Sequence, residues 1–228
     1  MKKSMVIFIG LLVSLAIMLC SCSNPEVDLY REAESHFKKG EYDQAIHKTT
    51  RALEVTNGGK WNTWGSVYLL DGSIWLLRAR SYVAMGKLDE AISDYKAAIS
   101  RGNEYVSSTA LSSNPKPGAK AEWYRTFSQY FNFLGIAYAK AEKFEDALAQ
   151  FKLAVDVAGR SVNKVGLTDQ LVGNVFGGET GKRKEFAKTV GAYCYNAGLI
   201  EEKLGRTSNA KEIAKQLDYD KALVIKLD

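Results

Sequence analysis

The stretch GGETGKRK at residues 177–184 contains a Gly-Lys pair of the kind that phosphate-binding loops use to hold a nucleotide. Such a loop also needs a glycine five residues before the pair and a serine or threonine after it, because the hydroxyl group binds magnesium. Phe176 and Arg183 occupy these two positions. We therefore favour a basic loop between structural elements over a nucleotide site.

The two histidines, His36 and His47, are eleven residues apart across a predicted turn. Ligands on one helix face would be three or four residues apart, and neither histidine has a cysteine near it in the sequence. His36 also falls on a packing position of the repeat described below. The sequence therefore predicts no metal site.

Acidic pairs and Cys194 have structural explanations as well. The pairs Asp89-Glu90 and Glu145-Asp146 begin predicted helices, where carboxylates stabilise the helix dipole. Cys194 lies at an apolar position, which favours a buried and unreactive thiol. The sequence therefore predicts neither an enzyme nor a cofactor. One alternative stays open, an enzyme in which the loop at 159–183 closes over a site.

One sequence pattern occurs several times along the chain. MGKLDEAISDYKAAI (85–99) is close to KGEYDQAIHKTTRAL (39–53) and to AEKFEDALAQFKLAV (141–155), and LGRTSNAKEIAKQL (204–217) is a weaker copy. The third copy is preceded by large residues three apart, a small residue and then an aromatic residue, and the second copy largely keeps this order. The first copy follows it more loosely, and the fourth is degenerate. The positions predicted to pack the repeats together are Trp75, Ala79, Tyr82, Ala91, Leu134, Gly135, Tyr138, Ala147, Phe151, Gly198 and Ala210.

This spacing predicts pairs of antiparallel helices. Residues three and four apart lie on one helix face, and the small residues let the second helix approach closely. Gly40, Gly86 and Gly205 stand where the first helix of a pair must end, because glycine adopts the left-handed conformation at little cost. Glu142 holds this place in the third copy, so we expect a strained or differently capped turn there. A single pair cannot bury both of its faces, so the pairs must stack.

The pattern resembles the tetratricopeptide repeat family. The resemblance implies an all-α, right-handed superhelical solenoid of about four helical hairpins, at approximately 26–56, 66–102, 119–158 and 184–217, with a tail at 218–228. The closing proline of the family is absent from all copies, and the copies are further apart than the family period of about 34 residues. We therefore expect longer first helices and loops near 57–65, 103–118 and 159–183.

The resemblance also implies a groove lined by the first helices, which binds a segment of a protein partner. The groove positions that it implies are Tyr30, Glu34, Phe37, Leu76, Arg80, Val83, Asn132, Ile136, Tyr195 and Leu199. Tyr30 and Glu34 stand where chaperone-binding relatives hold a carboxylate with lysine and asparagine, so that ligand is not predicted. Two outcomes stay open, an accessible groove and one filled by the chain's own insertions. Trp61 and Trp64 are a second candidate surface, although core packing is favoured for them.

The first residues indicate export. Lys2 and Lys3 precede an apolar run from Met5 to Leu19, which is too short to span a membrane as a helix. The sequence LCSC at 19–22 resembles the bacterial lipobox and implies a signal peptide at 1–21 and lipid attachment to Cys22. An ordinary secreted protein cleaved nearby is the alternative. Ser23 after the cysteine resembles the outer-membrane sorting signal, so we expect an envelope protein at the outer membrane, facing the periplasm.

These features together predict a membrane-anchored adaptor that binds envelope proteins. Removal of residues 1–21 lowers the net charge of +5 by two, which is too mild a charge to indicate nucleic-acid binding. The sequence does not predict an oligomeric state. A transporter-associated lipoprotein that binds a small ligand between hairpins is the alternative function. Asn24-Pro25-Glu26 is typical of a helix start, so only Ser23 separates the repeats from the expected anchor.

Overall fold

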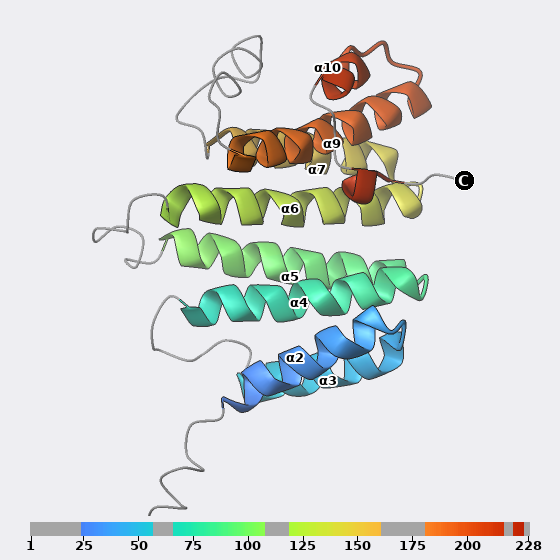
Figure 1. The fold of residues 1–228 in the computed structure, drawn as a ribbon. Coiled ribbons are helices and arrows are strands. Elements are labelled where there is room, and N and C mark those ends of the chain that lie inside the picture. Colours follow the sequence, from blue (N-terminus) through green and yellow to red (C-terminus); the bar gives the residue numbers. More distant parts are fainter. Residues whose placement is uncertain (1–23, 57–65, 108–118, 161–180, 217–220, 226–228) are drawn as a thin grey trace, which may run out of the picture.

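The computed structural model describes residues 24–56, 66–107, 119–160, 181–216 and 221–225, and every regular element in these ranges is a helix (Figure 1). Consecutive helices form antiparallel hairpins, and each hairpin packs on the next. This arrangement confirms the predicted all-α solenoid. The elements are α2 (Pro25–Lys38), α3 (Tyr42–Val55), α4 (Ser66–Ala84), α5 (Leu88–Ser107), α6 (Ala119–Lys140), α7 (Phe144–Arg160), α9 (Gly181–Lys203), α10 (Ala210–Gln216) and the 3-10 helix η1 (Lys221–Leu223).

Helix α2 begins at Pro25, with Asn24 as its N-cap residue. The sequence suggested a capping side chain, but the Asn24 side chain makes no capping hydrogen bond. The main-chain oxygen of Asn24 instead accepts a hydrogen bond from the Val27 N–H at 2.9 Å. Proline is favoured at this first position because its ring fixes a helical φ and its missing N–H is not needed there.

The loops are shorter than the sequence suggested. Helix α5 extends through Gly102 to Ser107, beyond the expected hairpin end. A Cβ atom at Gly102 would lie 2.2 Å from Cε2 of Phe127 in α6, so this glycine permits close packing and does not end the helix. The expected loop at 159–183 is also shorter at both ends, because α7 reaches Arg160 and α9 begins at Gly181. Its remainder, together with Cys22, Trp61 and Trp64, lies outside the described residues.

The turns within the four described hairpins share one hydrogen-bonded geometry. In each turn, the N–H group three residues beyond the last helical residue donates to a carbonyl five residues earlier, which is the Schellman motif. The left-handed residue has a φ of 79° at Gly40, 74° at Gly86 and 69° at Gly205. The same position in the third hairpin is Glu142, with a φ of 59°, as expected from the sequence. The donor–acceptor pairs are Glu41–His36, Lys87–Tyr82, Lys143–Tyr138 and Arg206–Glu201.

Replacing Glu142 with glycine should therefore raise the free energy of unfolding by about 0.5–1 kcal/mol. The left-handed conformation costs a residue with a Cβ atom about 1–2 kcal/mol, and the greater freedom of glycine in the unfolded chain offsets part of that gain. Gly86→Ala is the matched control and should destabilise the protein by a similar amount. Urea denaturation measures both, and an unchanged midpoint for Glu142→Gly would contradict the expected strain.

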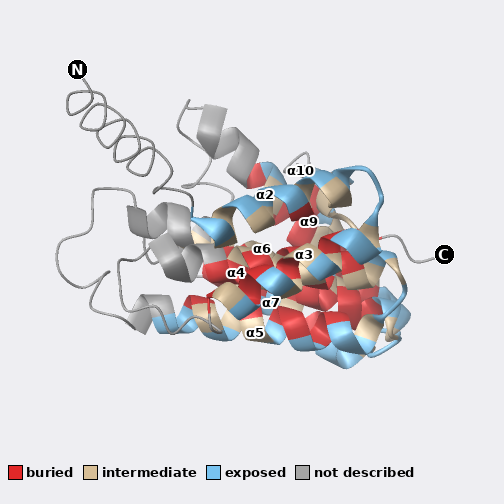
Figure 2. Ribbon diagram, turned by 90° about the horizontal axis from the view of Figure 1, so that it is seen from below, coloured by how far each residue is buried: buried red, intermediate tan, exposed pale blue. Residues whose placement is uncertain are grey.

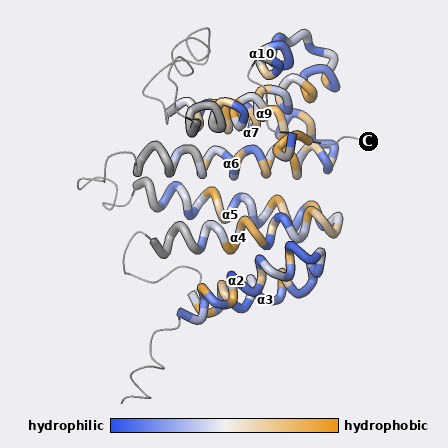
Figure 3. Tube along the Cα trace, in the orientation of Figure 1, coloured by the Kyte–Doolittle hydropathy of each residue, from blue (hydrophilic) through white to orange (hydrophobic). Residues whose placement is uncertain are grey.

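Small residues bring the helices together, as the repeat pattern requires. Ala79, Ala91 and Ala147 are completely buried. A Cβ atom at Gly135 would lie 2.7 Å from the ring of Phe151. Buried residues gather where the helices face one another (Figure 2), and the coloured parts of the helices carry both polar and apolar residues (Figure 3). Of the other predicted packing residues, Leu134, Tyr138, Phe151 and Gly198 are buried, and Trp75, Tyr82 and Ala210 are partly buried.

Asp71 in α4 places a carboxylate inside this stack. Its side chain is buried, and its Oδ2 atom lies 3.6 Å from Nη2 of Arg101 in α5. Burial raises the pKa of Asp71, and the charge of Arg101 offsets only part of that effect. The folded chain therefore keeps this proton at a pH at which the unfolded chain has released it.

This pKa shift predicts a measurable pH dependence of stability. The Asp71 carboxyl group makes the free energy of unfolding fall as the pH rises from about 4 through the raised pKa of the folded state. Asp71→Asn should remove this contribution. Urea denaturation between about pH 4 and pH 7 should therefore show a less negative slope for the variant than for the wild type. Parallel pH profiles of the two proteins would contradict the raised pKa.

Candidate binding face

Helices α2, α4, α6 and α9 lie next to one another on one side of the solenoid (Figure 1). Helix α2 contacts α4, α4 contacts α6, and α6 contacts α9. In stacked helical repeats, such neighbouring helices line an extended surface that is suited to binding. We call the surface of these four helices the inner face.

Three helices contribute to an exposed cationic group on this face. The Arg80 guanidinium in α4 lies 4.7 Å from the ring centroid of Phe37 in α2 and 5.4 Å from that of Phe133 in α6. We call these three residues the Arg80 site. Nearby in α2, the Tyr30 hydroxyl donates a hydrogen bond to Glu34 Oε1 at 3.2 Å. Burial, with the charge of Glu34, raises the pKa of Tyr30, so its hydroxyl stays protonated.

The Arg80 site has the properties of an anion-recognition group. Contact with two aromatic rings orients the guanidinium plane and leaves its N–H groups free to bind a carboxylate or a carbonyl oxygen. Arg80 is exposed, and it makes no ion pair with another described residue. Because the aromatic partners come from the first and third hairpins, the site exists only when the repeats are stacked.

The other end of the inner face is covered by the chain itself. Segment 221–225, which includes η1, lies against α6 and α9 (Figure 1). Asn132 of α6 and Asn196 of α9 are completely buried. Asn132 Nδ2 donates to the Leu223 main-chain oxygen at 3.3 Å, and Asn196 Nδ2 donates to the same oxygen at 2.9 Å. The Ile225 N–H donates to Asn196 Oδ1 at 2.9 Å.

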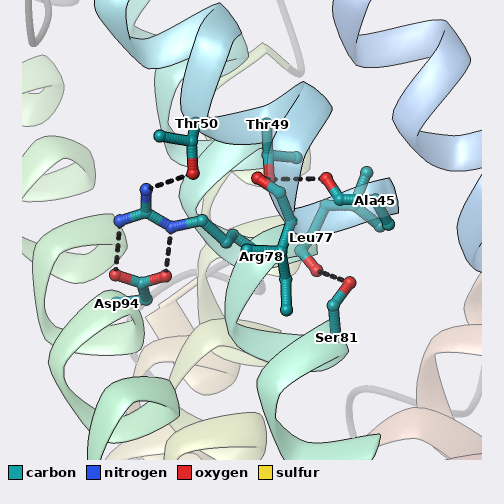
Figure 4. Close-up of polar contacts among 8 residues, drawn as sticks. Ala45, Thr49, Thr50, Leu77, Arg78, Ser81 and Asp94 are labelled. Carbon is teal, nitrogen blue, oxygen red and sulfur yellow. Dashed lines mark hydrogen bonds and ion pairs between the residues drawn. The ribbon is translucent and has the colours of Figure 1, made fainter. Parts of the chain in front are cut away.

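A buried ion pair joins the two helices of the second hairpin, and its arginine also donates a hydrogen bond to the first hairpin. Arg78 of α4 donates from Nε to Asp94 Oδ2 at 2.7 Å and from Nη2 to Oδ1 at 2.9 Å (Figure 4). Its Nη1 atom donates to the Thr50 hydroxyl of α3 at 3.0 Å. The guanidinium also lies 4.6 Å from the Trp75 ring centroid. This cluster therefore holds α3, α4 and α5 together and has a structural role.

Comparison with protein families now identifies the repeat. A tetratricopeptide repeat family model matches residues 30–105 and 76–113, and a second tetratricopeptide repeat model matches residues 191–219. These matched residues carry tetratricopeptide repeats. Comparison with curated proteins gives no match. Tetratricopeptide repeats typically form non-enzymatic scaffolds that bind other proteins, which indicates a role in protein–protein interaction.

Two properties of the described residues concern membranes and metals. The described helices include none that is long and apolar enough to cross a membrane. The same residues contain no group of three or more histidine, cysteine, aspartate or glutamate side chains that could hold a metal ion.

The predicted groove residues divide into an open part and a covered part. The open part contains the exposed Arg80, and Tyr30, Glu34 and Phe37 of α2 lie close to it and are partly buried. Asn132 was expected on an open groove but lies beneath segment 221–225. The sequence left open whether the groove is accessible or filled by the chain itself. The chain covers it at Asn132 and leaves it exposed at Arg80. The remaining groove residues, Leu76, Val83, Ile136, Tyr195 and Leu199, are partly buried, and their role in binding stays a prediction.

Sequence reasoning missed several residues of this face. Phe133 completes the Arg80 site. Asn196 donates a hydrogen bond to the same Leu223 carbonyl as Asn132 does. A signal for the asparagines is present in the sequence: each interrupts an apolar run, YFNFL at 130–134 and YCYNAGL at 193–199. A lone amide within an apolar helix face indicates a buried hydrogen-bonding group. The sequence does not show which main-chain groups it binds.

Cys194 in α9 should react slowly with alkylating reagents. Burial raises the pKa of its thiol to about 11, and only the thiolate is reactive. At pH 8, we expect iodoacetamide to label Cys194 about 100-fold more slowly in the folded protein than in urea, with a rate that rises toward pH 11. Mass spectrometry of the labelled peptide distinguishes Cys194 from the other cysteines. Equal rates in the folded and unfolded protein would contradict the pKa shift.

Proposed function

We propose that this protein is a lipid-anchored adaptor of the bacterial cell envelope that binds a partner protein at the open part of its inner face. The observation that carries the proposal is the Arg80 site, where Phe37 and Phe133 from different hairpins hold an exposed guanidinium. Aromatic and arginine side chains dominate the binding energy of many protein interfaces. The partner segment supplies a carboxylate or carbonyl oxygen to Arg80 and an apolar side chain to the neighbouring rings.

The anchor in this proposal is a lipid on Cys22. Its support is the basic and apolar leader, followed by the lipobox-like sequence at 19–22. Helix α2 begins at Pro25, so the repeats start close to the expected anchor. Two or more acyl chains make such an attachment durable. The inner face therefore works close to the membrane surface, and we place it at the outer membrane, facing the periplasm, because of Ser23.

Site-specific crosslinking in intact cells tests the partner. A photo-reactive amino acid at Glu34 on the inner face should capture one defined envelope protein, whereas the same group at the exposed Ser93 of α5 should not. Arg80→Ala should reduce the yield from Glu34 at least about tenfold, because an anchoring arginine is lost. Arg80→Lys keeps the charge without the planar stacking and should give an intermediate yield. Equal yields with and without the Arg80→Ala substitution would overturn the role of this site.

Metabolic labelling with a fatty acid tests the anchor. The wild type should carry the label and fractionate with membranes, and Cys22→Ser should lose both properties. Cys20→Ser is the matched control and should keep them. A long flexible linker inserted after Ser23 tests whether the partner is reached at the membrane: crosslinking should fall when the repeats are moved away. Full capture with the linker would contradict a membrane-proximal partner.

A further inference from the structure

The contacts of segment 221–225 have the form of peptide recognition. Asn196 Nδ2 donates both to Asn132 Oδ1, at 2.8 Å, and to the Leu223 carbonyl, and Asn196 Oδ1 accepts from the Ile225 N–H. All partners of the two amides in this segment are main-chain groups. Such hydrogen bonds do not depend on the side chains of the bound segment. We call Asn132 and Asn196 the amide clamp.

Side chains of the segment supply the apolar part of the contact. Ile225 is 4% exposed and belongs to the core cluster that includes Leu134 and Ile200. Leu223 packs against a different cluster, which includes Phe131 and Tyr193. The two side chains are two residues apart, on either side of the clamped main chain. The clamp therefore fits a short segment with apolar side chains at positions i and i+2, a free carbonyl at the first and a free N–H at the second.

The occupant of the amide clamp satisfies its polar groups. Both asparagines are completely buried with segment 221–225 in place, and the main chain of the segment supplies hydrogen-bond partners, as buried amides require. We propose that the amide clamp is a second peptide-binding site, which the chain's own segment 221–225 occupies and which accepts a partner segment of the same apolar-x-apolar chemistry in exchange. This inference rests on the proposed adaptor function and adds a regulated second contact to it. A tethered segment competes through its high local concentration, so the free site is a minor state.

A peptide of this chain's own sequence is the direct probe. Fluorescently labelled DYDKALVIKLD, residues 218–228, is titrated against the full-length protein and against Leu223→Asp/Ile225→Asp, in which charges replace the partly buried Leu223 and the buried Ile225 side chains. We expect the variant to bind the peptide at least tenfold more tightly than the wild type, because its own segment no longer competes. A control peptide with aspartate at the same two positions should not bind. Equal affinities of the wild type and the variant would overturn the proposal.

A second substitution assigns the binding to the clamp. Asn196→Ala, added to the Leu223→Asp/Ile225→Asp variant, should weaken peptide binding at least tenfold, and retained affinity would overturn the proposal. Circular dichroism melting establishes that each variant still unfolds cooperatively. If Leu223→Asp/Ile225→Asp does not fold, Ile225→Ala in the full chain provides the same comparison. We expect it to bind the peptide at least threefold more tightly than the wild type. No gain there would equally refute the exchange.

The Arg80 site separates this inference from the proposed function. Arg80→Ala in the Leu223→Asp/Ile225→Asp background should leave the peptide affinity within twofold. Failure of the peptide to bind, with crosslinking from Glu34 still dependent on Arg80, would refute the amide clamp alone. Peptide binding that depends on Asn196, without any crosslinked envelope protein, would refute the proposed function alone.

Discussion

Replacing Arg78 with leucine should lower the free energy of unfolding by about 3–5 kcal/mol. The substitution leaves the Asp94 carboxylate, whose side chain is 6% exposed, without the two hydrogen bonds that Arg78 donates to it. A buried charge that loses its partner keeps its full desolvation cost. The Thr50 hydroxyl of α3 loses a donor in the same step, so the interface between the first and second hairpins is weakened as well.

Two further variants separate the charge effect from lost packing. Arg78→Leu/Asp94→Leu removes both charges and should recover most of the loss, because a buried pair replaced by apolar residues is often neutral in stability. Arg206→Leu breaks an exposed ion pair with Glu145 and should cost less than about 1 kcal/mol. Urea denaturation measures all three. If the double variant were as unstable as Arg78→Leu, packing of the arginine side chain, and not the unpaired carboxylate, would explain the loss.

Features of the fold that depend on local spacing could be predicted from the sequence. The buried alanines and the left-handed turns at Gly40, Gly86 and Gly205 follow from what a small side chain permits. Even the exception at Glu142 was predictable, because the turn geometry is set by the two helices that it joins. The repeat period and the stacking of hairpins follow from the same pattern.

Features that depend on pairing between distant residues could not be predicted. Arg78 occupies a position that is apolar in the third copy, and only the fold shows that Asp94 and Thr50 accept its hydrogen bonds. Nothing in the sequence indicates that segment 221–225 lies on Asn132, which is far from it in the chain. The second hairpin was expected to end near residue 102, yet α5 continues to Ser107, and Gly102 within it leaves room for the Phe127 ring of α6. In each case a tertiary contact overrides the local signal.

Phe151→Ala should lower the free energy of unfolding by about 3–5 kcal/mol, because it leaves a cavity in the third hairpin. Phe151 is completely buried, and its ring faces Gly135 across the hairpin, where an added Cβ atom would be 2.7 Å away. Gly135→Ala in the wild-type background should therefore cost about 1–3 kcal/mol through overpacking. Both effects arise from the same space between α6 and α7, which the Phe151 ring fills beside Gly135.

The two substitutions should consequently be non-additive, with a change of sign. In the Phe151→Ala background the space opposite Gly135 is empty, so Gly135→Ala should stabilise the protein by about 0.5–1 kcal/mol through the better helix propensity of alanine. A four-protein thermodynamic cycle in urea measures the coupling directly. The same Gly135→Ala change must be unfavourable beside the phenylalanine ring and favourable without it. An equal cost in both backgrounds would show that the backbone conformation of α6 requires glycine at position 135. The close approach of the Phe151 ring would then not be the reason for it.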